Sequence, residues 1–170
     1  MYGKQTETAI AALSRLAEVY DAGKTRLSAS DIARDRGLQG PFVAKLLTVL
    51  SQAGLVDGTP GPGGGYALAR SPSKIKLYDV YSLFEREDTS DACPFGGGIC
   101  GVGDPCAIHD KLVAIQAALA DLLRNTTLEE FRRRYQDEGV RPTPAELLVN
   151  GARRKSYRAP RSGAAAGRAE

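Results

Sequence analysis

Three cysteines and one histidine lie within one short stretch of the chain and carry its most specific chemistry. They are the only residues of their kinds in the sequence: Cys93, Cys100, Cys106 and His109. Thiolate sulfur and imidazole nitrogen are the ligands that zinc and iron–sulfur clusters take from proteins. Five glycines in the same stretch let the chain wrap a small object with its backbone N–H groups turned inward. The pattern therefore predicts a metal centre between residues 93 and 109.

Spacing alone leaves the kind of centre open. An iron–sulfur cluster and a tetrahedral Cys₃His zinc site fit the four donors about equally well. A metal-free thiol switch is a third interpretation, because an exposed cytosolic thiol can be oxidised. Three cysteines do not make a closed disulfide framework. An enzyme that uses Cys106 and His109 as nucleophile and base is rejected, because nothing supplies an oxyanion site or a substrate pocket.

The elements around this loop are predicted to be mainly helical. Helical spacing of apolar residues, capping residues and glycine stops indicate these segments: 6–20, 31–36, 41–53, 75–84, one from about 108, and one that a capping box at Thr126–Glu129 starts. Ser28 or Ser30 is expected to cap the second helix, and Pro41 opens the third. The second and third helices, joined by a tight glycine turn, have the proportions of a helix-turn-helix.

The third helix is expected to bury one apolar stripe and expose a polar face. The predicted stripe is Phe42, Leu46, Val49 and Leu50, and the predicted outer face is Ala44, Lys45, Thr48 and Gln52.

Two short predicted strands, 55–57 and 66–68, follow the third helix and enclose a glycine- and proline-rich stretch. A helix-turn-helix followed by such a hairpin is a winged helix. Gly63, Gly64 and Gly65 permit backbone angles closed to other residues and a close approach to a surface. Spacing alone favours a flexible turn and a wing tip on a DNA backbone equally. A nucleotide-binding loop is rejected because no Gly-Lys-Ser/Thr follows.

A regular apolar stripe marks the helix after the cysteines. Its members recur in steps of four and three: Ile108, Leu112, Ile115, Leu119 and Leu122. This is an a/d seam of about two heptads, typical of a dimerisation helix or of an amphipathic helix on its own domain. Dimerisation is preferred, because the preceding domain already closes a small core and leaves the stripe without a partner in the same chain.

Charge is distributed unevenly along the chain. Residues 1–84 hold ten basic and seven acidic side chains, residues 85–140 six and eleven, and residues 141–170 seven and two. A mildly basic N-terminal part is consistent with a DNA-binding domain. With no apolar run near ~18 residues and no secretion signal, we expect a cytoplasmic protein without a membrane span.

Four regions are expected along the chain. They are a winged-helix DNA-binding domain (1–84), a cysteine-rich cluster-binding loop (85–106), a dimerisation helix with a following helix (107–138), and a basic, disordered tail (139–170).

The order of these motifs resembles the Rrf2 family of bacterial regulators, the IscR, NsrR and RirA type. The resemblance covers roughly residues 4–136 and rests on the segment 37–56, the wing motif 61–66, and the three-cysteine loop ahead of a long helix. It implies a cytoplasmic, nucleoid-associated homodimer that binds a pseudo-palindromic operator in double-stranded DNA and is not an enzyme. It also implies an iron–sulfur cluster that sets DNA affinity in response to iron, redox state or nitric oxide.

The resemblance also assigns candidate ligands. With Cys93, Cys100 and Cys106, His109 matches the fourth ligand of IscR-like members, which implies a 2Fe–2S centre. Glu7 matches an acidic ligand that NsrR-like members supply from the first helix of the other subunit; His109 is preferred. Six residues separate Cys93 from Cys100, where other members have five or seven. The cluster type, 2Fe–2S or 4Fe–4S, therefore does not carry over.

On the DNA side, the helix 41–53 is expected to enter the major groove. Its expected contacts to bases or phosphates are Gln39, Pro41, Lys45 and Thr48. Lys4 and the wing residues Gly63, Gly64 and Gly65 are expected to contact the DNA backbone. Ala44 stands where IscR-like members carry a base-reading glutamate, and Pro60 replaces an arginine at the wing base. We therefore expect a different operator from that of IscR.

Overall fold

The computed structural model describes residues 3–85, 93, 95, 98, 99, 102 and 106–139. In chain order its elements are α1 (Lys4–Glu18), α2 (Ala29–Arg36), α3 (Gly40–Gln52), β1 (Val56–Thr59), β2 (Gly65–Leu68), a 3-10 turn η1 (Pro72–Lys74), α4 (Leu77–Phe84), α5 (His109–Asn125) and α6 (Glu129–Glu138). This confirms the mainly helical fold with a two-stranded hairpin. Within the described ranges, no helix is long and apolar enough to cross a membrane. Apart from Gly139, the predicted tail lies outside the described residues.

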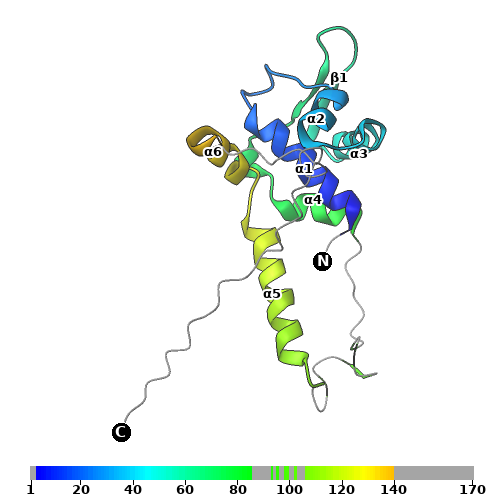
Figure 1. Cartoon of the computed structure of the whole chain (residues 1–170), viewed down its shortest axis with the longest axis vertical. Coiled ribbons are helices and arrows are strands. Elements are labelled where there is room, and N and C mark those ends of the chain that lie inside the picture. Colours follow the sequence, from blue (N-terminus) through cyan, green and yellow to red (C-terminus); the bar gives the residue numbers. More distant parts are fainter. Residues whose placement is uncertain are drawn as a thin grey trace, which may run out of the picture.

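The helices enclose one apolar core, and α1 lies at its centre. It contacts α2, α3, α4 and α6, as Figure 1 shows. Leu13, Ile32, Leu47, Leu50 and Val80, from four different helices, are fully buried there. Helix α5 leaves this body and projects away from it (Figure 1), while α6 returns to pack against α1.

The buried face of α3 differs from the predicted one. The residues that the structure buries are Val43, Leu46, Leu47 and Leu50. Phe42 and Val49 are only partly buried. Both candidate stripes are apolar and helically spaced, so periodicity could not separate them. Packing against α1 and α2 selects the stripe that contains Val43 and Leu47.

Capping agrees with the sequence at α2 and departs from it at α6. The Ser28 hydroxyl accepts the Asp31 N–H at 3.1 Å, and Gly37 ends α2 in the left-handed conformation. The predicted capping box before α6 does not form: the N-cap residue of α6 is Leu128, and no side chain caps the helix. The backbone there is engaged elsewhere: the Leu77 N–H donates to the Thr126 carbonyl at 3.0 Å. This bond ties the end of α5 to the start of α4.

Candidate nucleic-acid interface and metal centre

The hairpin β1–β2 forms a wing that projects from the domain beside α3 (Figure 1). Its antiparallel register runs from Val56 opposite Leu68 to Thr59 opposite Gly65. Leu27 adds a third strand segment, since it exchanges two backbone hydrogen bonds of 3.0 and 2.8 Å with Tyr66. The base of the wing is therefore fixed to the segment that precedes α2.

Arg26, which sequence reasoning missed, reinforces this base. Its guanidinium pairs with the Asp57 carboxylate at 2.6 Å and donates to the Asp57 carbonyl at 3.1 Å. Asp57 is on β1, so the contact holds one wing strand against the α1–α2 connection. No local sequence signal joins the two residues, because 31 positions separate them.

The tip of the wing is a turn built from glycines. Gly61 and Gly63 have φ values of 90° and 76°, and the Gly64 N–H donates to the Gly61 carbonyl at 2.9 Å. A Cβ on Gly64 would lie 2.2 Å from the Thr59 carbonyl oxygen. The chain thus folds onto itself so closely that a side chain does not fit. Such a defined turn favours a wing tip over a flexible connection.

The outer face of α3 and the wing share one groove. Its volume is about 330 Å³, and its lining residues are Thr48, Ser51, Gln52, Gly58, Thr59, Pro60 and Tyr66. Pro41, Lys45 and Thr48, predicted to contact DNA, are exposed, and so is Gln39 just before the helix. Helix α3 and the wing therefore present one continuous surface. Gln52 is predicted to lie on this outer face, whereas Ser51 and Thr59 join the surface only through the fold.

Helix α2 is held on α1 by a buried ion pair. The Arg36 guanidinium contacts the Glu18 carboxylate at 2.6 Å, and the two side chains are 3% and 2% exposed. Arg36 also donates to the Ser14 hydroxyl at 3.0 Å and to the Ala11 carbonyl at 3.1 Å. These bonds satisfy the buried charge and fix the angle at which α2 supports α3.

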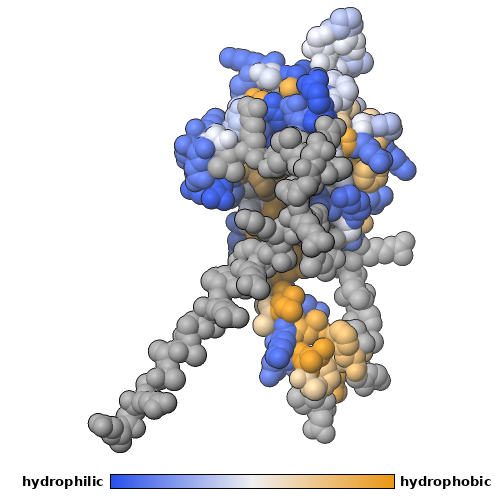
Figure 2. Space-filling model, viewed as in Figure 1, coloured by the Kyte–Doolittle hydropathy of each residue, from blue (hydrophilic) through white to orange (hydrophobic). Residues whose placement is uncertain are grey.

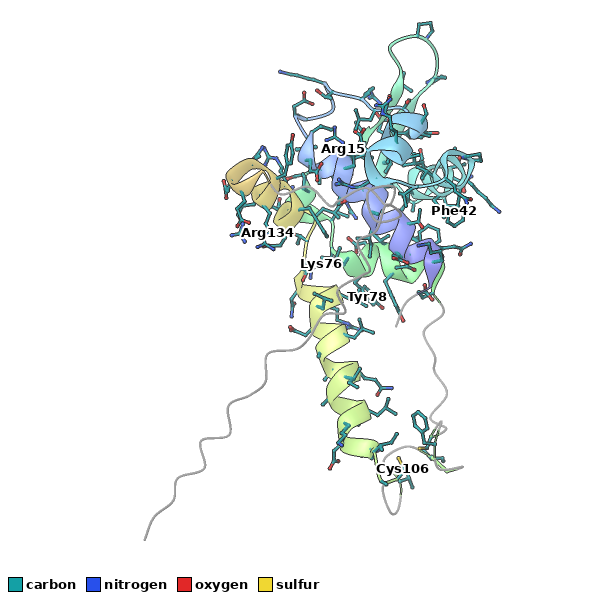
Figure 3. The ribbon with its side chains drawn as sticks, viewed as in Figure 1. Arg15, Phe42, Lys76, Tyr78, Cys106 and Arg134 are labelled. Carbon is teal, nitrogen blue, oxygen red and sulfur yellow. The ribbon has the colours of Figure 1, made fainter. Side chains whose placement is uncertain are left out.

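The predicted contact Lys4 and the predicted ligand Glu7 form an ion pair on the first turn of α1. Their N···O distance is 3.1 Å, and the side chains are 71% and 56% exposed. The pair belongs to the winged-helix body, whereas Cys106 lies at the opposite, projecting end of α5 (Figure 3). Within one chain, Glu7 is therefore not brought to Cys106.

Two of the predicted ligands lie together where α5 begins. His109 is the first residue of the helix, and its N–H donates to the Cys106 carbonyl at 3.0 Å. In the loop, the Cys93 N–H donates to the Gly98 carbonyl at 2.7 Å. Cys100 lies outside the described residues. Among the described residues, neither Cys93 nor Cys106 is in a disulfide, and three or more His, Cys, Asp or Glu side chains nowhere gather to hold a metal.

The start of the cysteine loop is anchored to the start of α1. The Glu85 carboxylate accepts the Gly3 N–H at 2.6 Å and the Thr6 hydroxyl at 2.5 Å. These bonds hold the pKa of Glu85 below its ordinary value because they favour the ionised form, and the bond from Thr6 has the larger effect. Glu85 thus ties the first residue of the predicted cysteine loop to the end of α1 that carries Lys4.

The apolar stripe of α5 is largely uncovered in the single chain. Ile108, Ile115 and Leu122 are 40%, 65% and 47% exposed. Figure 2 shows apolar residues along this projecting helix, beneath a largely hydrophilic body. Leu123, which is not part of the predicted stripe, is the α5 residue that enters the core.

Comparison with known proteins agrees with this architecture. Residues 2–134 match the Rrf2 family, described as an iron-dependent transcriptional regulator. The HTH-type transcriptional regulator IscR of Escherichia coli is 32% identical over 123 residues, which cover 72% of this chain and 74% of IscR. The structure of T. potens IscR has a TM-score of 0.61 at 23% identity, covering 86% of this chain and 96% of that one. CymR, the global cysteine regulator of B. subtilis, has a TM-score of 0.60 at 24% identity, covering 78% and 96%.

The two structural likenesses show a shared winged-helix fold, and the family match with the IscR relative adds a shared sequence. These relatives are transcriptional regulators and not enzymes. The chain belongs to the Rrf2 family of transcriptional regulators.

Proposed function

We propose that this chain acts in the bacterial cytoplasm as a homodimeric repressor or activator whose operator affinity is set by an iron–sulfur cluster. Cys93, Cys100, Cys106 and His109 would hold the cluster, with 2Fe–2S preferred over 4Fe–4S. The observation that carries the proposal is that Cys106 lies immediately before α5, where its carbonyl accepts the backbone N–H of His109, the first residue of the helix. Ligands at that point would couple a metal centre directly to the proposed dimerisation helix.

The donor set fits such a cluster. Thiolates and an imidazole are its usual protein ligands, and backbone N–H groups of a glycine-rich loop stabilise its sulfurs. When bound, the cluster would supply a group that responds to iron, oxidants or nitric oxide. Glu7 stays an alternative fourth ligand only if the partner subunit supplies it, because within one chain α1 lies in the winged-helix body and Cys106 at the far end of α5.

The DNA-binding part of the proposal uses the outer face of α3 and the wing. Lys45 is exposed and, among the described residues, pairs with no carboxylate, so its charge is available to a phosphate or base edge. Thr48 lines the groove that α3 shares with the wing. Gln39, Pro41, Lys4 and the wing glycines Gly63, Gly64 and Gly65 are the other proposed DNA contacts. Two such surfaces in a dimer would read half-sites about 34 Å apart.

Dimerisation through α5 is supported by its exposed stripe. A single chain leaves Ile108, Ile115 and Leu122 in water, and pairing with a second α5 would bury them.

Coupling between cluster and DNA needs little energy. A 10- to 100-fold change in operator affinity corresponds to about 1.4–2.8 kcal/mol. The bonds that Gly3 and Thr6 donate to Glu85 would connect the cysteine loop to the start of α1.

The test is anaerobic purification followed by absorbance spectroscopy, iron and sulfide analysis, and operator binding by fluorescence anisotropy. We expect absorbance between about 320 and 460 nm, matching iron and sulfide, and different operator affinities of the loaded and cluster-free protein. His109→Ala should alter the spectrum more than Glu7→Ala. Equal affinities of the two forms would refute cluster control.

A second candidate is a thiol sensor without a cluster, which is favoured by the fold similarity to CymR, the global cysteine regulator of B. subtilis. It predicts a colourless protein whose operator affinity changes with thiol oxidation, and Cys106→Ser would abolish that change. One zinc per chain and no redox response would instead support a zinc-stabilised regulator.

A further inference from the structure

A second groove lies where α5 meets the winged-helix body. Its volume is about 500 Å³, and its lining residues, which define the joint groove, are Arg70, Lys74, Lys76, Tyr78, Asp79 and Arg124. Lys76 and Tyr78 lie on the side of the body from which α5 projects, away from the tip of the wing (Figure 3). The joint groove is therefore separate from the surface proposed to bind DNA.

The joint groove has a much higher proportion of basic to acidic side chains than the described chain as a whole. The ranges 3–85 and 106–139 hold 15 basic and 14 acidic residues, whereas the groove has four cations and one carboxylate. That carboxylate, Asp79, is engaged: it pairs with Arg70 at 3.2 Å and accepts the Lys76 N–H at 3.0 Å. Within the described chain, Lys74, Lys76 and Arg124 pair with no carboxylate. Four gathered cations repel one another, and an anion would relieve this repulsion.

The two arginines are already positioned by the protein. The Arg124 guanidinium lies 4.8 Å from the centre of the Tyr78 ring, and this ring stacks on Tyr81 with centroids 6.2 Å apart. Arg70 is held by its ion pair with the Asp79 carboxylate. A guanidinium fork offers paired N–H donors that match phosphate oxygens, and lysines add point charges. Fixed arginines flanked by lysines thus suit a phosphate group.

We propose that the joint groove binds a small, multiply charged anion that carries phosphate groups, and that this anion ties α5 to the winged-helix body. Arg124 comes from α5, whereas Arg70, Lys74 and Lys76 come from the body. An anion held between them adds to the adjacent backbone bond from Leu77 to Thr126 and stiffens the joint. Because α5 is the proposed dimerisation helix, occupancy would shift the spacing of the two DNA-binding surfaces and so the operator affinity.

The test is a calorimetric titration of the full chain with pyrophosphate, at ionic strength kept constant with sodium chloride. We expect saturable binding of one pyrophosphate per chain, at least tenfold weaker in the Lys74→Gln/Arg124→Gln variant. Lys24→Gln, which removes an exposed lysine outside the groove, should bind like the parent. Heats without saturation, or equal weakening by Lys24→Gln, would overturn the proposal.

A second variant keeps the test decisive if loss of the Arg124–Tyr78 contact unfolds the chain. Lys74→Gln/Lys76→Gln changes only exposed side chains, and it too should weaken pyrophosphate binding at least tenfold. The phosphate source is tested with short operator duplexes. If pyrophosphate competes with DNA, and this variant weakens DNA binding as much as Lys45→Gln, the groove contacts the DNA backbone and a separate anion site is ruled out.

Discussion

Replacing Gly64 by alanine tests whether the wing acts as a built surface. The new Cβ would lie 2.2 Å from the Thr59 carbonyl oxygen and 2.8 Å from that of Gly61, far inside ordinary contact, which begins at 3.4 Å. Both contacts are backbone atoms, so no side-chain rotation relieves them. Thr59 pairs with Gly65 at the end of the hairpin. The collision must therefore open the last pair of the wing.

The magnitude follows from what is lost. The turn gives up the hydrogen bond from Gly64 to the Gly61 carbonyl, which contributes about 1 kcal/mol. Displacing the backbone adds about 1 kcal/mol of strain. The bonds between Leu27 and Tyr66 still hold the base of the wing. We therefore expect the free energy of unfolding to fall by only about 2 kcal/mol in total. Operator affinity should fall roughly tenfold, equivalent to about 1.4 kcal/mol of lost contacts.

Urea unfolding measures the first quantity, and fluorescence anisotropy with a labelled operator measures the second. The matched control is Gly23→Ala, since Gly23 has φ 85°, a Cβ added there would meet nothing within 4 Å, and the residue lies outside the wing. It should lose about 1 kcal/mol to backbone strain and keep parental affinity. If Gly64→Ala binds the operator like the parent, the wing does not contact DNA as reasoned.

Three further predictions test the supports of the two surfaces. Arg36→Met leaves Glu18 buried without its main partner and should cost about 2–4 kcal/mol in chemical denaturation, whereas adding Glu18→Leu should restore most of it; an unrescued double variant would contradict this. Ile115→Glu should give monomers in sedimentation equilibrium and Gln116→Glu should not, since only Ile115 belongs to the apolar stripe; a dimeric Ile115→Glu variant would exclude this interface. Glu85 has a lowered pKa, so its ionised form stabilises the fold above its ordinary value of 4.5, and this contribution is lost as the pH falls through the folded pKa. Glu85→Gln should therefore lower stability at neutral pH and converge with the parent in acid, and a constant difference down to pH ~2 would argue against the assigned bonds.

Local rules let the sequence predict most of the helices and the two-stranded hairpin. Helical periodicity predicted the helix ends to within about two residues. Ser28 caps the start of α2 and Gly37 ends it, as expected. The clustered cysteines and the order of helix-turn-helix, wing and long helix sufficed to indicate the family. Each of these signals operates over a few residues, so no knowledge of packing is needed to interpret it.

Other features depend on residues distant in the sequence. Two apolar stripes were available on α3, and only its neighbours α1 and α2 decided that Val43 is fully buried and Phe42 only partly so. The predicted capping box failed because backbone groups before α6 found partners before α4. On α3, non-local contacts chose between two equivalent local patterns, and before α6 they outweighed a local capping preference.

The charged contacts show the same division most clearly. Composition gives the number of arginines, but only the tertiary structure joins Arg36 to Glu18 in the core and Arg26 to Asp57 at the wing. It alone brings Arg124 beside the lysines that precede α4 to form the joint groove. Residue types and spacings thus predict a metal site and a DNA-binding surface, while long-range packing decides where the charges of the protein meet. The reason is that the energy of an ion pair depends on a separation and a burial that the linear sequence does not encode.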